Sequence, residues 1–410
     1  MIEVSTEQAQ TFILTQQGLL TNSPTTIIDV AKKIHNIQID TISVVARSHD
    51  LILFNRKPDY LEGGIWNLLE EKKLFEFWSH GICLIPIEEY PFYAWKMDYR
   101  KVNPDNWWKK WLPKNEEVIT EVYNYVKKNG PTCSADFKRQ EKKKSEGWWD
   151  WKKEKMALEI LFDQGKLLIA YRKNFQKYYD IKDRVLPPGI SSEPLPKDEL
   201  ADYLVKTVCS SLGIASYEEF RHYIGRDVFK YLWKNNKNSV NKFLQNKIKE
   251  DYLIEVNIKE QETKYFTLKQ FENELKNTNN VNAQNNSVKF LTPFDNVIRD
   301  RELPLRLWNF DYKIECYTPA PQRIFGYFTL PILDGHKFIG RTDLKAHRKE
   351  SILEIKSLHF ENWYDPTVDS YQRLSTAFIH FAKFHDCSEI QINKEVPKKI
   401  RDAITIKFPT

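Results

Sequence analysis

From residue 37 the sequence reads Ile37-Gln38-Ile39-Asp40-Thr41-Ile42-Ser43-Val44-Val45-Ala46-Arg47-Ser48-His49. A carboxamide, Gln38, and a carboxylate, Asp40, stand on either side of one apolar residue. If residues 37–41 are extended, both polar side chains point to the same side, because a strand alternates its faces with a period of two. A Gln and an Asp on one side can hold a water molecule and face a developing positive charge, which hydrolysis of an N-glycosidic bond requires.

The same residues fit a purely structural interpretation. Residues 42–54 have the pattern of a helix that carries Arg47 and His49, and Asp40 or Thr41 would be a suitable N-cap for it. The two interpretations are compatible, because a capping residue can also lie at the mouth of a cleft. Both stay open at the level of sequence.

Working outward, the chain has the pattern of an α+β protein of tandem winged-helix (helix-turn-helix) domains followed by a small C-terminal antiparallel β-barrel. Each predicted winged helix consists of helices and then two short strands. The predicted domains cover residues 1–115, 116–186, 187–276 and 277–410. The predicted strand pairs of the three winged helices are 74–78 with 82–86, 167–172 with 176–180, and 253–258 with 264–267.

In the last predicted domain the pattern changes to alternating strands separated by turn residues. A terminal amphipathic helix is expected over residues 371–384, and the Asn-rich segment 276–287 before the strands lacks apolar periodicity. The strands predicted for the barrel are 312–317, 324–331, 337–343 and 351–360.

Positive charge is concentrated in one part of the chain. The whole sequence has 62 Lys and Arg against 56 Asp and Glu, whereas residues 138–177 alone have 12 against 6. Such a local excess is typical of a phosphate-binding surface. The predicted helix 148–164, ended by Gly165, would be the recognition helix, with Lys152 and Lys155 as groove or phosphate contacts. For Trp148, Trp149 and Trp151 the alternative is core packing, and Trp151 is assigned to the core.

Composition excludes several classes of protein. The chain has 410 residues, of which 41% are hydrophobic, so it can bury substantial cores. No run of eighteen apolar residues occurs, which argues against a membrane protein. The five cysteines are scattered without a Cys-x-x-Cys motif, so neither a disulfide framework nor a metal site is expected, and no cofactor is predicted. We expect a protein of the reducing cytoplasm.

The stretch Gln38–His49 resembles the signature of the YcaQ/AlkZ-type DNA glycosylases, winged-helix proteins of bacteria that remove bulky alkylated bases and unhook interstrand crosslinks. It has the Gln-hydrophobic-Asp form of the YcaQ branch. The resemblance extends over most of the chain and recurs at Phe75–His80, Gly147–Lys152, Pro293–Arg301, Tyr317–Pro321 and Lys345–Lys349.

This resemblance implies a monofunctional, metal-independent glycosylase that acts on N7-alkylated purines and crosslinks in double-stranded DNA. Asp40 would activate water and stabilise an oxocarbenium-like sugar, while Gln38 would orient the water or the sugar. The protein would be a monomer, cytoplasmic and associated with the bacterial nucleoid. The residues predicted to contact DNA are Arg47, His49, Trp148, Trp149, Lys152, Lys155, Arg299, Arg301, Gln322 and Arg323.

Alternatives remain for several residues and for the function. Arg299 and Arg301 are equally suited to pair with Asp295 and Asp300 as structural ion pairs. His49 and His80 are candidate secondary site residues, although a lone histidine is more often structural. The alternative function is a winged-helix transcription regulator with an effector-binding barrel, which would not need Gln38 and Asp40. A nuclease is disfavoured because no carboxylate cluster for a divalent metal is evident.

Overall fold

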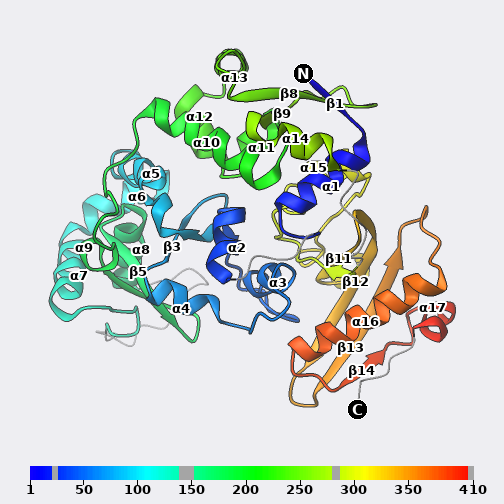
Figure 1. Ribbon diagram of the computed structural model, residues 1–410. Helices are drawn as coiled ribbons and strands as arrows, with labels where there is room; N and C mark the ends of the chain where they lie inside the picture. Colours follow the sequence, from blue (N-terminus) through cyan, green and yellow to red (C-terminus); the bar gives the residue numbers. More distant parts are fainter. Residues whose placement is uncertain (21–25, 138–151, 279–286, 405–410) are drawn as a thin grey trace. The chain divides into compact units, whose positions relative to one another are not determined.

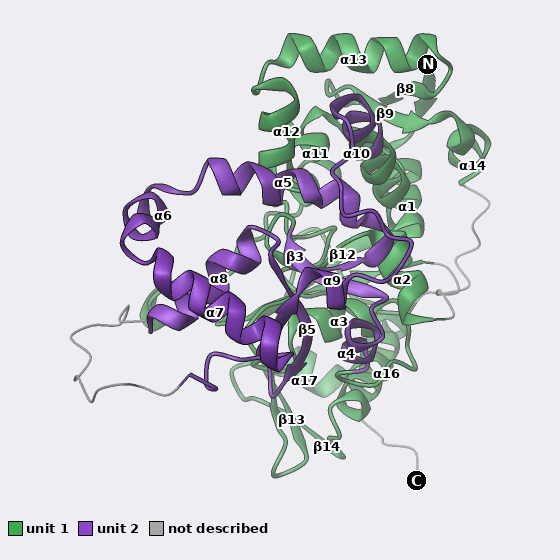
Figure 2. Ribbon diagram, turned by 90° about the vertical axis from the view of Figure 1, so that its left-hand side faces the viewer, with its two compact units in different colours: residues 1–63, 79–82, 204–410 green, residues 64–78, 83–203 purple. Residues whose placement is uncertain are grey.

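The computed structural model describes residues 1–20, 26–137, 152–278 and 287–404. Contacts between Cα atoms divide the chain into two compact units (Figure 2). Unit 1 comprises residues 1–63, 79–82 and 204–410, and unit 2 comprises residues 64–78 and 83–203. The chain passes from unit 2 into unit 1 for the last time within α10 (Lys197–Leu212). The division into four domains stays a prediction.

Unit 1 is a mixture of helices and strands, as an α+β protein requires. It starts with β1 (Ile2–Val4), α1 (Thr6–Gln16), α2 (Ile27–Ile34), β2 (Ile37–Gln38) and α3 (Ser48–Phe54) (Figure 1). After α10 it continues with β7 (Ala215–Ser216), α11 (Tyr217–His222), α12 (Arg226–Trp233), α13 (Lys237–Lys249), β8 (Leu253–Ile258), β9 (Tyr265–Leu268) and α14 (Glu272–Lys276). It ends with β10 (Lys289–Phe290), α15 (Glu302–Trp308), β11 (Thr329–Asp334), β12 (Lys337–His347), β13 (Ile352–Phe360), α16 (Val368–Phe384), β14 (Glu389–Ile392) and α17 (Lys398–Ala403).

The first sheet of unit 1 joins distant parts of the chain. Its strand order is β1-β8-β9-β7. β8 and β9 pair antiparallel, as predicted for the third strand pair, and β1 adds to β8 in parallel, with Ile2 opposite Val256. The N-terminal strand is thereby fixed by residues more than 250 positions later in the sequence.

The helix predicted over residues 42–54 is shorter than expected. α3 begins only at Ser48, its N-cap is Arg47, and residues 41–47 are irregular. The capping role predicted for Asp40 or Thr41 is therefore wrong. The side chain of Asp40 accepts the backbone N–H of Ile42 at 2.7 Å, as a cap would, but no helix follows it, and the β-branched residues Ile42, Val44 and Val45 are weak helix formers.

The C-terminal sheet has the order β10-β11-β12-β13-β14 and is curled like half a barrel (Figure 1). β10 to β13 pair antiparallel, but β14 pairs with β13 in parallel, so the prediction of a purely antiparallel barrel is wrong in this detail. Within the described residues β10 and β14 are the two edges of an open sheet.

The strand predicted over residues 312–317 does not form. The carboxylate of Glu315 accepts backbone N–H groups from Ile324, Phe325 and Gly326, so this segment closes a loop instead of pairing in a ladder. The predicted helix 371–384 is confirmed as the larger part of α16. Phe378 and Phe381 of this helix pack on Phe290 of β10, with ring centroids 4.8 and 5.3 Å apart.

Unit 2 holds the two remaining strand pairs, except that the turn between β3 and β4 and the first residue of β4, Ile82, belong to unit 1. Its elements are α4 (Ile65–Glu70), β3 (Leu74–Trp78), β4 (Ile82–Pro86), α5 (Tyr90–Val102), α6 (Asn106–Trp111), α7 (Glu116–Asn129), α8 (Lys153–Asp163), β5 (Leu167–Lys173), β6 (Gln176–Ile181) and α9 (Lys182–Val185). The bounds predicted for β3 and β4 are confirmed, and so is the pairing of β5 with β6.

Gly165 ends α8 as predicted. Its φ of +65° is the left-handed conformation that glycine adopts most easily, and an added Cβ would lie 2.4 Å from Sδ of Met97. The predicted start of this helix at Trp148, together with Trp149 and Trp151, lies outside the described residues. The order α7, α8, β5, β6 fits the plan of a winged helix, and the winged-helix assignment stays a prediction. Among the described residues no helix has the length and apolar character needed to span a bilayer.

Candidate active site

The segment around β2 has the alternation that its sequence predicts. Ile37 and Ile39 are buried, whereas Gln38 and Asp40 are half-buried, as expected if the two polar residues share the more accessible side. β2 has only two residues, and the backbone N–H of Ile39 continues its pairing by donating to the carbonyl of Ile82 at 2.8 Å. This bond keeps the chain extended between Gln38 and Asp40.

His80 contacts the side chain of Gln38. Nε2 of His80 lies 3.0 Å from Oε1 of Gln38. Because a carboxamide oxygen only accepts hydrogen bonds, Nε2 of His80 must carry the proton, and this fixes both the tautomer and the orientation of the carboxamide. The amide NH₂ group of Gln38 is then the end that can donate to another partner.

The turn that carries His80 is held from a second side. The hydroxyl of Ser79 donates to the carbonyl of Ile224 at 3.0 Å. Gly225 has a φ of +116°, and a Cβ at this position would lie 2.8 Å from the carbonyl oxygen of Ser79. Only glycine permits this approach, so the local sequence Ile224-Gly225 positions His80 and, through it, Gln38.

Asp40 is held by backbone hydrogen bonds in a partly desolvated position. Burial raises the pKa of its carboxyl above the ordinary value, and the backbone N–H groups of Ile42 and Thr41 offset this only in part. Its negative charge contributes to the raised pKa values of the Cys316 thiol, after burial, and of the Tyr317 phenol, after the Cys316 thiol and burial. The negative charge of Asp40 therefore reaches the loop that starts at residue 316.

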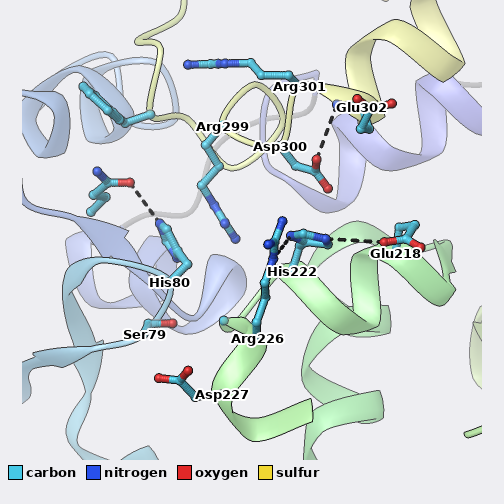
Figure 3. A pocket seen from close by; sticks show the side chains of 13 residues that line it. Ser79, His80, Glu218, His222, Arg226, Asp227, Arg299, Asp300, Arg301 and Glu302 are labelled. Atoms are coloured by element: carbon cyan, nitrogen blue, oxygen red, sulfur yellow. Dashed lines mark hydrogen bonds and ion pairs between the residues drawn. The ribbon is translucent and has the colours of Figure 1, made fainter. Parts of the chain in front are cut away.

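A cavity of about 690 Å³ lies beside Gln38 within unit 1. Figure 3 shows the side chains of His80, His222 and Arg299 directed into it. His222 accepts from Nε of Arg226 at 3.3 Å and lies 3.4 Å from the carboxylate of Glu218. Burial lowers the pKa of His222. Asp40 is not among the lining residues, so the cavity adjoins the Gln38 side of the site.

The segment Pro293–Arg301 supports the chain just before β2. The side-chain amide of Asn296 donates to the carbonyls of Asn36 and Ile34 at 3.2 and 3.3 Å and to the Tyr223 hydroxyl at 3.1 Å. These bonds connect the predicted motif at 293–301 to the segment that leads into β2, with Asn36 lying 260 positions before Asn296 in the sequence.

The charged side chains of this segment also bind partners outside it. Asp295 pairs with Arg56, whose guanidinium donates at 2.7 and 3.0 Å and is fully buried. Arg299 donates to the carbonyl of Tyr223, and its guanidinium lies 5.0 Å from the centroid of that ring. Arg301 donates to two backbone carbonyls and lies 4.7 Å from the ring centroid of Tyr312.

The predicted DNA-contact residues occupy different environments. Gln322 is exposed, and Arg323 is half-buried on the same loop, with Nε donating to the carbonyl of Thr318 at 2.9 Å. Arg47 is half-buried, and its positive charge acts on Asp50 and Glu62. His49 is fully buried with Nε2 3.4 Å from Oδ2 of Asp50, so it has no surface to offer to DNA.

The other predicted contacts belong to unit 2. Lys152 and Lys155 are half-buried at the start of α8, and Nζ of Lys152 donates to the carbonyl of Phe137 at 2.9 Å. Trp148 and Trp149 lie outside the described residues.

Sequence reasoning missed several residues of this region. Glu218, His222 and Arg226 lie in helical segments without a recognisable motif, and nothing in their spacing points to a site. Tyr317 belongs to a block that resembles the glycosylase family, and its isolated position before Pro319 and Pro321 was the signal that could have singled it out. Among the described residues no group of three or more His, Cys, Asp or Glu side chains is placed to hold a metal ion.

Two comparisons with known proteins bear on this site. Residues 32–384 match the model of the family described as DNA glycosylase AlkZ-like. Among solved structures, the chain is similar to the DNA glycosylase AlkZ of Streptomyces sahachiroi, with 15% sequence identity and a TM-score of 0.65. That likeness covers 97% of this chain and 100% of the Streptomyces chain, and at this identity it shows a shared fold.

Proposed function

The chain belongs to the family of AlkZ-like DNA glycosylases, and from that premise we propose that it releases N7-alkylated purines from double-stranded DNA and unhooks interstrand crosslinks. Alkylation at N7 makes the purine cationic, so the base leaves as a neutral molecule and needs little help from a general acid. The enzyme must instead stabilise an oxocarbenium-like sugar and deliver water. The observation that carries the proposal is the half-buried carboxylate of Asp40 next to Gln38.

Asp40 is proposed to act as general base and as the anion that faces the sugar. Its Oδ1 is held by the N–H of Ile42, which fixes the plane of the carboxylate, and Oδ2 is the oxygen that we assign to the attacking water. A raised pKa makes the carboxylate a stronger base. Both roles need the charged form.

Gln38 is proposed to orient the water or a sugar oxygen. Its Oε1 is occupied by His80, so its NH₂ group donates toward the substrate. For contact with the DNA backbone we retain Gln322, Arg323, Arg299, Arg301, Arg47, Lys152 and Lys155, all of which are described and none of which is fully buried. The protein is proposed to act as a monomer without a metal.

The test uses duplex oligonucleotides that carry one N7-methylguanine or one N7–N7 mustard crosslink, with EDTA present. We expect the wild-type protein to release free base, to leave an abasic site that alkali cleaves, and to convert the crosslinked band to single strands. Binding should weaken steeply with salt and should tolerate changes of sequence. Intact substrates together with selective binding to one duplex sequence would contradict the proposal and favour the transcription regulator.

His80 offers a separate test of how Gln38 is positioned. Replacing His80 by Ala removes the donor to Oε1 of Gln38, so the carboxamide can rotate, and we expect base release to slow by roughly tenfold, the scale of one lost hydrogen bond of ~1.4 kcal/mol. The measurement is the single-turnover rate on N7-methylguanine DNA.

The matched variants are His80→Gln, which can still donate to Gln38, and Gln38→Ala. We expect His80→Gln to recover part of the rate, and the double variant His80→Ala/Gln38→Ala to be no slower than Gln38→Ala alone. Additive losses in the double variant would show that His80 acts independently of Gln38.

A further inference from the structure

The loop between Glu315 and β11 presents large apolar side chains to solvent. Tyr317 is 86% exposed and Ile324 is 73% exposed, and Pro319, Ala320 and Pro321 between them are exposed as well. Exposed apolar surface next to a polar site is costly in water unless a partner covers it. The loop forms neither an α-helix nor a strand pair at these residues, so regular structure does not account for the exposed apolar side chains.

The loop is built to hold its shape. The buried carboxylate of Glu315 accepts the backbone N–H of Ile324 at 3.1 Å, of Phe325 at 2.9 Å and of Gly326 at 3.1 Å. Burial alone would raise the pKa of this carboxyl, but these N–H groups outweigh it and hold the pKa below the ordinary value. The loop therefore contains a charge-assisted anchor at its base.

Further bonds close the loop from one end to the other. The backbone N–H of Thr318 donates to the carbonyl of Glu315 at 2.9 Å, and Nε of Arg323 donates to the carbonyl of Thr318 at 2.9 Å. A 3₁₀ turn over Ala320–Gln322, flanked by Pro319, fills the space between them. A side chain presented by such a loop loses little conformational entropy on binding.

The exposed ring lies within range of the negative charge of the proposed catalytic carboxylate. The thiol of Cys316, burial and the charge of Asp40 together raise the pKa of the Tyr317 phenol. Asp40, Tyr317 and Ile324 all belong to unit 1. Polar groups of the same loop, Gln322 and Arg323, are suited to the phosphates of a nucleic acid, which makes DNA a better occupant than a protein surface.

We propose that Tyr317, with Ile324 at the other end of its loop, is the wedge that stacks on the base step next to the lesion and holds it open while Asp40 acts. The inference rests on the proposed glycosylase function. Bringing the sugar of the lesion to Asp40 unstacks neighbouring bases, and a rigid aromatic ring replaces the lost stacking. Any base can supply the opposite face, so the contact tolerates any sequence.

The test compares Tyr317→Ala, Tyr317→Phe and Tyr317→Trp with the wild type in single-turnover release of N7-methylguanine. We expect Tyr317→Ala to be about 5- to 140-fold slower, which is ~1–3 kcal/mol of lost stacking at 1.4 kcal/mol per factor of ten, and Phe and Trp to stay near the wild-type rate. Because a mismatch opposite the lesion lowers the cost of unstacking, the deficit of Tyr317→Ala should shrink in a mismatched duplex.

Two controls separate this inference from the function on which it rests. Trp363→Ala removes another exposed ring of unit 1, 51% exposed, and should release base at the wild-type rate. Asp40→Asn should be equally slow in matched and mismatched duplexes, because its defect is chemical. If the wild type releases base and Tyr317→Ala is as fast, or if Tyr317→Phe is as slow as Tyr317→Ala, the stacking role is overturned while the glycosylase stands. A wild type that releases no base would overturn both.

Discussion

Replacing Asp40 by Asn is expected to lower the single-turnover rate of base release by roughly a hundredfold or more, the scale of a positioned acid–base group. Asn has nearly the same shape and can keep the bond from the N–H of Ile42 through its carbonyl oxygen, so the fold around β2 should persist. What is lost is the negative charge that faces the sugar and accepts the proton of water. Binding to undamaged duplex should change little.

The pH profile of the same reaction tests whether the charged form of Asp40 is the active one. The charged form of Asp40 is active, so the rate should fall as pH falls through the pKa of this carboxyl. Because burial raises that pKa, with partial opposition from the N–H groups of Ile42 and Thr41, the acidic limb should lie above the ordinary value of 3.8. In Asp40→Asn this limb should disappear from the residual activity.

The matched control is Asp59→Asn, the same chemical change at an exposed residue of unit 1 that pairs with Lys57. It should leave the rate and the pH profile unchanged. Equal rates for Asp40→Asn and the wild type would remove Asp40 from the mechanism, even if the protein proves to be a glycosylase.

The largest effect on stability is expected for Arg56→Met. The guanidinium of Arg56 is fully buried and donates to both carboxylate oxygens of Asp295 and to the carbonyls of Gln17 and Ile52. Removing it leaves the charge of Asp295 buried without its partner, which typically costs about 3–5 kcal/mol. The midpoint of thermal unfolding, followed by calorimetry, should fall by on the order of 10 °C for a unit of this size.

Two further variants serve as controls for the loss of stability in Arg56→Met. Lys276→Met removes an exposed i,i+4 partner of Glu272 in the same unit and should change the midpoint little. The double variant Arg56→Met/Asp295→Leu removes both buried charges and should be more stable than Arg56→Met alone. A midpoint for Arg56→Met as high as that of Lys276→Met would show that the pair does not support the fold.

Much of the local structure was accessible from the sequence. The bounds of β3 and β4, the strand β8, the hairpin of β5 and β6, and the left-handed glycine at Gly165 were predicted correctly. Each depends on alternation or on turn residues within a few positions, and such signals are carried by neighbouring residues alone. The same holds for the Gln38-Ile39-Asp40 pattern, whose burial alternates as a strand requires.

Two elements predicted from local signals differ in the structure. The helix predicted from residue 42 starts only at Ser48, after a segment in which the β-branched residues Ile42, Val44 and Val45 are weak helix formers. The strand predicted over 312–317 is absent, because Glu315 takes the N–H groups of Ile324, Phe325 and Gly326. In the second place a carboxylate satisfies backbone donors that a strand ladder would otherwise have used.

The sequence by itself determined the family resemblance, the pair Gln38 and Asp40, and the element types around them, because these depend on residues close together in the chain. The tertiary structure alone decided which distant groups complete the site: His80 on Gln38, Asn296 on Asn36, Arg56 on Asp295, and Tyr317 within range of the charge of Asp40. These partners are up to 277 positions apart, as Asp40 and Tyr317 are in the sequence. No local propensity encodes such pairs, since they form only when packing of buried surface brings the segments together and leaves each buried polar group in need of a partner.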